Sequence, residues 1–232
     1  MTKRLFDILV SIFLLTLLSP ILILISIIIK IVSRKGPIIF IAKRAGLKGK
    51  EFNLLKFRTM NISKKRKEKI TRHKEKITRH NDKRIFWFGL ILRKIMLDET
   101  PQLINVLFGE MSIVGPRAED ISIVKKYYTK KNLQTLNVRP GIISPGSIFN
   151  YTHSHLYLDE FKIEKSYVKK LLPIKLSMES IYIQRMNFFY DLKLIYLAIF
   201  IVTKKLLGFK GLHELEEFKI AKKNIKLKFF KN

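Results

Sequence analysis

The chain has 232 residues, and its 46 Lys and Arg outnumber its 18 Asp and Glu, which gives a formal net charge of +28. A chain of this length can bury one substantial core, and its positive field attracts nucleic acid, anionic lipid or phosphate-bearing substrates. The absence of cysteine excludes disulfides, thiolate catalysis and thiolate metal sites.

The first feature along the chain is an apolar run from Ile8 to Ile29 that carries no charge and is long enough to cross a bilayer. Ser19-Pro20 lies near its middle, where proline removes a backbone donor and kinks a helix, and Ser19 can satisfy a carbonyl freed at the break. Basic residues flank both ends: Lys3, Arg4, Lys30, Arg34 and Lys35.

Positive charge on both flanks keeps both ends in the cytoplasm. We therefore predict that residues 1–35 form a re-entrant helix-break-helix membrane hairpin, and we weigh this above a kinked full span and well above a buried soluble helix. A cleaved signal peptide is not expected, because no small-residue cleavage site follows the run.

The segment from Gly36 to Met60, "GPIIFIAKRAGLKGKEFNLLKFRTM", predicts a β-hairpin, because glycine and lysine turn residues separate two β-rich runs. Alternation in the second strand sends Lys56 and Arg58 to one face. Two cations on one face suit phosphate binding, although a solvated basic strand would show the same pattern.

The heptapeptide "KEKITRH" occurs at 67–73 and again at 74–80. The units are too short for a solenoid, so we predict a duplicated, exposed loop outside the site. Its two histidines, like His153 and His155, are interpreted as surface residues and not as metal ligands.

Further along, residues 84–97 predict an amphipathic helix rich in aromatic residues, which suits a membrane interface or a core. Next, we expect a helix that ends near Gly109, a short strand and a turn at Arg117. Residues 138–146 form a second proline- and glycine-rich loop, which carries Arg139.

Residues 191–208 predict an interfacial helix or, equally, a core helix. Residues 36–207 would then be the catalytic domain and 208–232 a charged, peripheral tail.

Asp98 and Glu99 stand side by side in "RKIMLDETPQL", within an otherwise basic chain. At a helix start they could simply cap the helix and complement its dipole. A carboxylate pair among cations is also the arrangement for a divalent metal with phosphate chemistry, or for attack on phosphorus. The cations in segments that could converge on the pair are Lys56, Arg58, Arg93, Arg117 and Arg139.

The order of these pieces resembles the bacterial sugar transferases, the small monotopic polyprenyl-phosphate phosphoglycosyl transferases. The resemblance runs over about residues 3 to 141, with a weaker echo in "FFYDLKLIYLAIFIVTKKLL". The matching segments are "KRLFDILVSIFLLTLLSP", "KFRTM", "RKIMLDETPQLINVLFGEMSIVGPR" and "VRPGI".

The resemblance implies an α+β enzyme on the cytoplasmic face of the bacterial inner membrane, with interfacial helices around a cytosolic catalytic domain. It implies transfer of a sugar phosphate from a UDP-sugar to polyprenyl phosphate, with release of UMP. Asp98 would be the nucleophile, and Glu99 would assist with Mg²⁺, or another divalent cation, or with proton transfer. Arg93, Arg117 and Arg139 would neutralise the transferring phosphoryl group.

The sequence departs from the family pattern at "IISPGSI", which replaces "GITGWAQ", and at Ala118, where a second proline is common. Both departures leave the acid pair intact and bear on the sugar and acceptor contacts. Three other interpretations stay open: direct transfer in a ternary complex, a non-catalytic membrane-surface protein, and a membrane-tethered nucleic-acid binder. No nucleic-acid-binding motif occurs, so nucleic acid is not an expected partner. The sugar, the glycan pathway and the oligomeric state are not fixed by the sequence.

Overall fold

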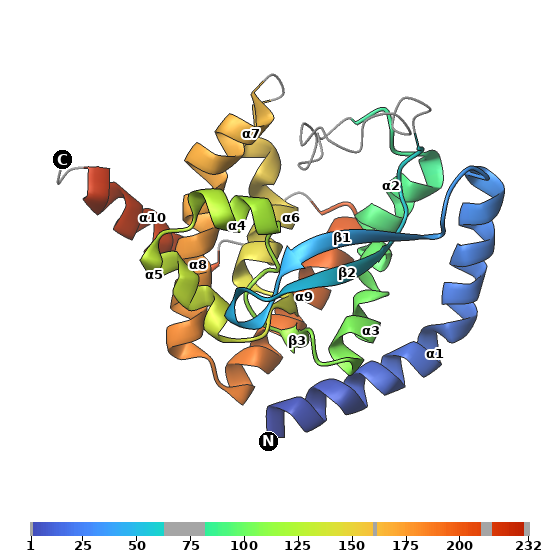
Figure 1. Cartoon of the computed structure of the whole chain (residues 1–232), viewed down its shortest axis with the longest axis horizontal. Coiled ribbons are helices and arrows are strands. Elements are labelled where there is room, and N and C mark those ends of the chain that lie inside the picture. Colours follow the sequence, from blue (N-terminus) through green and yellow to red (C-terminus); the bar gives the residue numbers. More distant parts are fainter. Residues whose placement is uncertain (1, 63–81, 160–161, 210–214, 230–232) are drawn as a thin grey trace. The chain divides into compact units, whose positions relative to one another are not determined.

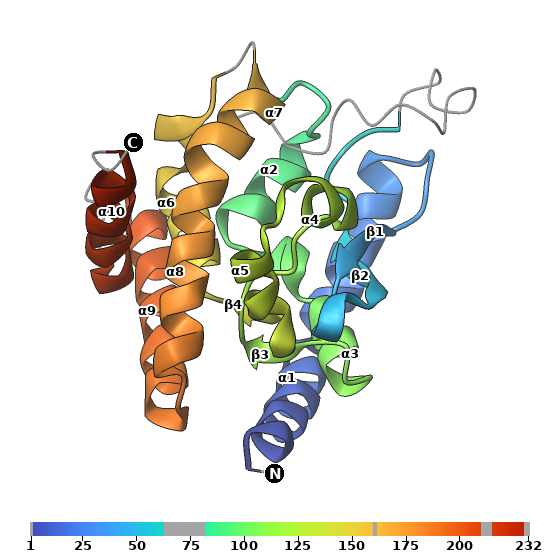
Figure 2. The same cartoon turned by 60° about the vertical axis from the view of Figure 1, so that its left-hand side comes forward.

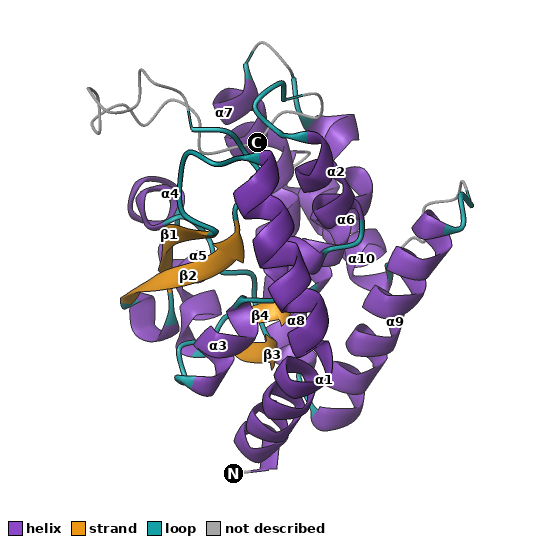
Figure 3. Ribbon diagram, turned by 90° about the vertical axis from the view of Figure 1, so that its right-hand side faces the viewer, coloured by secondary structure: helices purple, strands orange, loops and turns teal. Residues whose placement is uncertain are grey.

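The computed structural model describes residues 2–62, 82–159, 162–209 and 215–229 (Figure 1). The chain forms two compact units, of which the first contains residues 1–42 and 53–108 and the second residues 43–52 and 109–232. Both are built mainly from helices, with two small sheets of two strands each (Figure 3). This confirms a mixed fold of helices and small sheets. The repeated heptapeptide lies outside the described residues, and the predicted division at 35 and 207 stays a prediction.

The N-terminal apolar run forms a single helix, α1, from Thr2 to Val32, with Pro20 inside it. The predicted interruption of the helix is therefore wrong, and the ribbon of α1 instead bends within one continuous helix (Figure 1). The hydroxyl of Ser19 donates to the Thr16 carbonyl at 2.8 Å. That carbonyl is the one that loses its helical donor at Pro20, so the expected role of Ser19 is confirmed.

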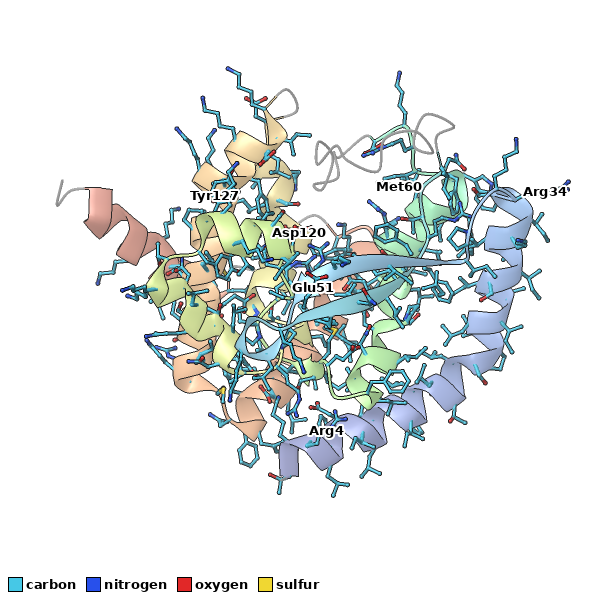
Figure 4. All side chains as sticks on the ribbon, in the orientation of Figure 1. Arg4, Arg34, Glu51, Met60, Asp120 and Tyr127 are labelled. Carbon is cyan, nitrogen blue, oxygen red and sulfur yellow. The ribbon has the colours of Figure 1, made fainter. Side chains whose placement is uncertain are left out.

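Most apolar side chains of α1 point away from the protein. An 18-residue window has a mean hydropathy of 3.0 and is only 11% buried, and among the described helices α1 alone is long and apolar enough to cross a membrane. Arg4 and Arg34 lie towards opposite ends of the α1 segment (Figure 4).

The predicted β-hairpin is present, with strands β1 (Ile39–Ala45) and β2 (Glu51–Phe57) joined by a 3₁₀ turn, η1 (Leu47–Gly49). Gly49 has φ +74°, a conformation that favours glycine. In the first unit, Phe57 at the end of β2 belongs to a buried apolar cluster with Ile25 and Ile29 of α1 and with Phe86 and Leu92.

Two short helices complete the first unit. Helix α2 (Trp87–Lys94) lies within the segment predicted as a helix; it buries Gly89 and Leu92 and exposes the apolar side chains of Trp87, Leu90 and Ile91. A 3₁₀ turn, η3 (Leu97–Glu99), and helix α3 (Gln102–Leu107) follow.

The second unit contains a parallel pair of strands, β3 (Ser112–Val114) and β4 (Gly141–Ile143), in which Ser112 is opposite Gly141 and Val114 is opposite Ile143. Residues 138–146, predicted as a loop, therefore contain a strand and the start of a helix. Between the strands lie α4 (Ile121–Tyr127), α5 (Lys130–Leu133) and a 3₁₀ turn, η4 (Gln134–Asn137).

Helix α6 (Pro145–Tyr157) begins immediately after β4. Ser144 is its N-cap and exchanges hydrogen bonds with Ser147 in a capping box, with proline at the first helical position. On α6, His153 is buried, with its ring stacked on Phe149 at 4.8 Å between centroids. The prediction that His153 lies on the surface was wrong, because its face of α6 is also covered. The same prediction holds for His155, which is exposed.

The remaining helices are α7 (Ile163–Ser166), a π-helical turn η5 (Tyr167–Leu171), α8 (Leu172–Arg185), α9 (Phe188–Leu206) and α10 (Glu216–Phe229). Helix α10 lies beside α8 (Figure 2) and buries Phe218 and Ala221, and Leu215, just before the helix, is buried too. The sequence indicated only a charged tail there, because the apolar residues are scattered among many lysines and give a weak periodic signal.

Helix α9 is neither wholly buried nor wholly exposed. It buries Leu194 and Ile201, whereas Phe189 is 80% and Tyr196 69% exposed. Of the two alternatives for this segment, a fully buried core helix is excluded. An exposed apolar face is what a helix at a membrane interface requires.

Candidate active site

The acid pair lies in a tight turn of the first unit. Asp98 and Glu99 belong to η3, and each is 8% exposed. Met96, just before the turn, has φ +61°, a left-handed conformation that costs a non-glycine residue about 1–2 kcal/mol. The residue at the N-cap of α3 is Pro101, and no side chain caps either η3 or α3. The alternative in which Asp98 is present as a helix cap is therefore wrong.

Two cations of the first unit accompany the pair. The ammonium group of Lys56, on β2, forms a short ion pair with Oε1 of Glu99. Arg93, in the last turn of α2, donates from Nε to the Thr59 hydroxyl at 2.8 Å, and its charge acts on Asp98. The structure thus brings together four of the predicted site residues: Lys56, Arg93, Asp98 and Glu99.

The two acids have different electrostatic surroundings. Burial raises the pKa of Asp98 to about 6; Lys56 and Arg93 oppose this rise, and the charge of Glu99 adds to it. Asp98 is therefore mainly ionised at neutral pH, although it is poorly solvated. A carboxylate in that condition is a stronger nucleophile, and a stronger ligand for a hard cation, than one in water.

Arg58, also predicted as a substrate-binding residue, has a different set of partners. Its guanidinium is buried and donates to the backbone carbonyls of Ser33 (2.6 Å), Pro37 (2.5 Å) and Met60 (3.2 Å), and to the Ser33 hydroxyl (2.6 Å). Burial lowers the pKa of Arg58. Three of these hydrogen bonds thus hold the segment that follows α1 and the fourth holds Met60, and the predicted contact of Arg58 with substrate stays a prediction.

Sequence analysis did not find Asn105, which connects α3 to the strand that carries Lys56. Its side-chain oxygen accepts from the Leu55 amide at 3.0 Å, and its side-chain nitrogen donates to the Asn53 carbonyl at 2.8 Å. The side-chain amide of Asn105 thus makes the two hydrogen bonds that a neighbouring strand would make with the backbone at the edge of β2. The available signal was an asparagine inside a short apolar helix, where it has low helix propensity.

The two remaining arginines, Arg117 and Arg139, belong to the second unit. The Gly141 amide donates to the Pro116 carbonyl at 2.9 Å, and Arg117 forms a parallel bridge with Gly141. A Cβ on Gly141 would lie 2.0 Å from the Gly115 nitrogen, so the two arginine-bearing loops meet backbone to backbone. Nε of Arg139 donates to the Gly109 carbonyl at 2.8 Å. The two arginine-bearing loops are thus neighbours within this unit, and the predicted convergence of Arg117 and Arg139 on the acid pair stays a prediction.

The donor set of the acid pair suits a divalent cation. Asp98 and Glu99 offer hard carboxylate oxygens, and among the described residues no group of three or more His, Cys, Asp or Glu could form a complete protein cage. Mg²⁺ typically binds through one or two carboxylates together with substrate phosphates and water. The residues present therefore fit Mg²⁺ held jointly by protein and substrate.

Comparison with known proteins matches residues 1–205 to the family described as bacterial sugar transferase. A UDP-glucose:undecaprenyl-phosphate glucose-1-phosphate transferase of Klebsiella pneumoniae is 36% identical over 200 residues, which cover 85% of this chain and 39% of that protein. The uncharacterized sugar transferase EpsL of Bacillus subtilis is 32% identical over 212 residues, which cover 91% of this chain and 90% of that protein.

A third relative is the exopolysaccharide production protein ExoY of Sinorhizobium fredii, 35% identical over 150 residues, which cover 61% of this chain and 66% of that protein. The matched region spans 39% of the length of the Klebsiella relative and of a similarly named Escherichia coli relative.

Proposed function

We propose that this chain, which belongs to the bacterial sugar transferase family, transfers a sugar 1-phosphate from a UDP-sugar to polyprenyl phosphate. The products would be a polyprenyl-diphosphate-sugar and UMP, in the first membrane step of surface polysaccharide or glycoconjugate assembly. The observation that carries the proposal is the buried acid pair, in which Lys56 pairs with Glu99 and Arg93 faces Asp98. Relatives named as undecaprenyl-phosphate sugar-phosphate transferases support it.

The proposed reaction has two steps. First, a carboxylate oxygen of Asp98 attacks the sugar-bearing phosphorus of the donor, the bond from that phosphorus to the bridging oxygen breaks, and UMP leaves with the electron pair. Second, a phosphate oxygen of the polyprenyl phosphate attacks the same phosphorus and releases the Asp98 carboxylate. The neighbouring cations stabilise the charge on the transferring group. The ion pair of Glu99 with Lys56 leaves Asp98 as the acid better suited to attack.

Asp98 and Glu99 would hold Mg²⁺ together with the diphosphate of the donor. The ion would neutralise charge on the leaving UMP, as divalent cations do in phosphoryl transfer. Excess chelator should abolish turnover, and added Mg²⁺ should restore it. Full turnover in chelator would overturn this part of the proposal and leave the charge to be neutralised by cations such as Arg93 and Lys56.

We further propose that α1 is a re-entrant helix, inserted from the cytoplasmic face of the inner membrane. Near the N-terminal end of α1, Arg4 donates hydrogen bonds to the Val106 and Leu107 carbonyls of the first unit, at 2.6 and 3.0 Å. Just after the other end of α1, Ser33 accepts hydrogen bonds from Arg58 of the same unit. A full span would put these two polar contacts on opposite sides of about 30 Å of hydrocarbon.

Cysteines introduced at Lys3 and Arg34 test this placement. Both should react with a membrane-impermeant thiol reagent only after the inner membrane has been opened. Reaction of one of them from the periplasmic side would establish a full span. The chain has no native cysteine, so labelling reports only the introduced residue.

A panel of UDP-sugars offered with undecaprenyl phosphate and Mg²⁺ tests the activity itself. One UDP-sugar should be consumed with release of UMP. Release of UDP would show a glycosyl transferase instead. No turnover of any donor, with membrane binding retained, would favour a non-catalytic protein at the membrane surface.

A further inference from the structure

A buried acid of the second unit, Glu179 on α8, contacts the backbone of the Arg117 loop. Its Oε1 accepts from the Arg117 amide at 3.2 Å and from the Ser144 hydroxyl at 2.7 Å. The side chain is 3% exposed. One carboxylate oxygen therefore holds two segments: Arg117, beyond the end of β3, and Ser144, directly after β4.

The residues packed around Glu179 fix the position of its carboxyl group. A Cβ on Gly146 would lie 2.3 Å from Oε1, so glycine is required for the carboxyl to reach its two donors. The other oxygen, Oε2, is buried and has no hydrogen-bond partner among the described residues. A buried acid with one unsatisfied oxygen destabilises a fold, so its presence calls for a role other than stability.

The strands next to the Arg117 loop and to the start of α6 are short. The parallel pair has only three residues in each strand, and Arg117 itself is joined to Gly141 by a single bridge. Loss of the Glu179 contact would remove the hydrogen bond that the Arg117 amide donates to this buried acid. A shift of about 1 Å in a group that binds substrate can reduce activity about 100-fold.

We propose that Glu179 is a positioning residue, which fixes the backbone of Arg117 so that its guanidinium is oriented towards the diphosphate of the nucleotide-sugar donor. The proposal rests on the proposed function for the identity of the donor, but the anchoring of the loop can be measured without any substrate.

The charged groups that face Glu179 are Lys175 on its own helix and Arg117 in the loop; Tyr128 and Tyr182 are the other titratable neighbours. Burial raises the pKa of Glu179 to about 7, against the Ser144 and Arg117 hydrogen bonds and the charge of Lys175, all of which lower it. Hydrogen bonds to an ionised acceptor are stronger than those to a neutral one. Anchoring of the Arg117 loop should therefore tighten as the pH rises through about 7.

The first experiment measures the KM for the UDP-sugar that the wild-type chain turns over, between pH 6 and 8.5. In the wild type, the KM should fall as Glu179 ionises. Glu179→Gln keeps an oxygen acceptor but cannot ionise, so this dependence should be absent from its profile. Glu179→Ala should raise the KM about tenfold, which corresponds to about 1.4 kcal/mol, with a smaller effect on kcat.

Two further variants keep the proposal falsifiable if Glu179→Ala does not fold. Gly146→Ala displaces the carboxyl without changing any charge and should raise the KM in the same direction. Asp191→Asn is the matched control: Asp191 is also a buried acid of this unit, but the hydroxyl that donates to it is that of Tyr182, at 2.7 Å. It should leave the KM unchanged.

The second experiment needs no substrate. Hydrogen exchange of the full-length chain in detergent should show faster exchange of the Arg117 amide in Glu179→Ala and Gly146→Ala than in the wild type or Asp191→Asn. Unchanged exchange in both variants would overturn the proposal, as would an unchanged KM. Faster exchange in a chain that turns over no UDP-sugar would retain the anchoring role and reject the proposed function.

Discussion

In the first unit, Asp98 is a buried acid whose neighbours are cations, whereas in the second unit Glu179 is a buried acid whose hydrogen bonds come from neutral groups. Burial raises both pKa values, to about 6 for Asp98 and about 7 for Glu179. Lys56 is the strongest opposing influence on Asp98, and the Ser144 hydroxyl is the strongest on Glu179. The cations near Asp98 favour its ionised form, and the neutral donors connect Glu179 to the Arg117 backbone and to Ser144.

The same contrast applies to the way each unit holds its arginines. Arg93 is placed by side-chain contacts, through Thr59 and the charge of Asp98. Arg117 is placed by its backbone, through Gly141 and Glu179. The first arrangement suits groups that take part in chemistry, and the second suits a loop that must meet a substrate in one orientation. The predictions below test this difference.

The largest effect is expected from Asp98→Asn. Asparagine has nearly the same volume but cannot attack phosphorus, so kcat should fall at least about 10³-fold. Asp82→Asn is a control, because Asp82 is a half-buried acid of the same unit whose partner is Arg84, at 2.8 Å. Turnover of both variants in the same membrane preparation measures the difference. Equal activity of Asp98→Asn and Asp82→Asn would show that Asp98 is not the reacting acid.

Lys56→Met should reduce kcat about 10²-fold, which is the usual loss when one preorganised charge-stabilising group is removed. The substitution also leaves Glu99 buried without its ion pair. Lys56→Arg should recover part of the activity, because it restores the charge. If Lys56→Met turned over normally, the ion pair would be structural only, and the contrast between the units would weaken.

Gly141→Ala should act on the arginine loops. The added Cβ would lie 2.0 Å from the Gly115 nitrogen and 2.6 Å from its carbonyl oxygen, and such overpacking costs about 1–3 kcal/mol. The KM for the UDP-sugar should rise about tenfold as the loops separate. Gly208→Ala is the control, since Gly208 has φ +78° but nothing within 4 Å of its Cβ position. It should cost stability without changing the KM.

The smallest effect concerns stability and pH. Because the folded-state pKa of Glu179 lies above its ordinary value, the stabilisation by the neutral acid is complete below about pH 4.5 and is lost as the pH rises through about 7. Glu179→Gln stays neutral throughout. Between pH 5 and 8, the Tm of the wild type should therefore fall by about 5 °C relative to Glu179→Gln. Parallel Tm profiles would show that Glu179 does not change ionisation in this range.

The sequence predicted most of what depends on local pattern. Two β-rich runs separated by turn residues identified β1 and β2, and the pattern of residues 84–97 identified the position of α2. Ser19-Pro20 identified the bend of α1 (Figure 1) together with the partner of the Thr16 carbonyl. It overstated the break at Pro20, because one serine hydroxyl is enough to keep the helix continuous. The acid pair was found because it lies within "RKIMLDETPQL", a segment that resembles the family pattern.

Features that depend on contacts between distant segments could not be predicted. Strand β4 is only three residues long and exists because β3 lies beside it. Glu179 is one acid in a helix of mixed composition, and nothing in its local sequence indicates that it meets the Arg117 amide 62 positions earlier. Likewise, Arg58 belongs to a promising basic strand, but the carbonyls that it binds come from the segment after α1 and from Met60.

The central claim is that Asp98 carries the phosphosugar during turnover. Donor incubated with the chain and Mg²⁺, without acceptor, should release UMP in proportion to the amount of enzyme. Mass spectrometry should then find a sugar-phosphate adduct on the peptide that contains Asp98, and addition of polyprenyl phosphate should remove it. UMP formed only when acceptor is present, with no adduct at any time, would contradict the covalent mechanism and establish direct transfer.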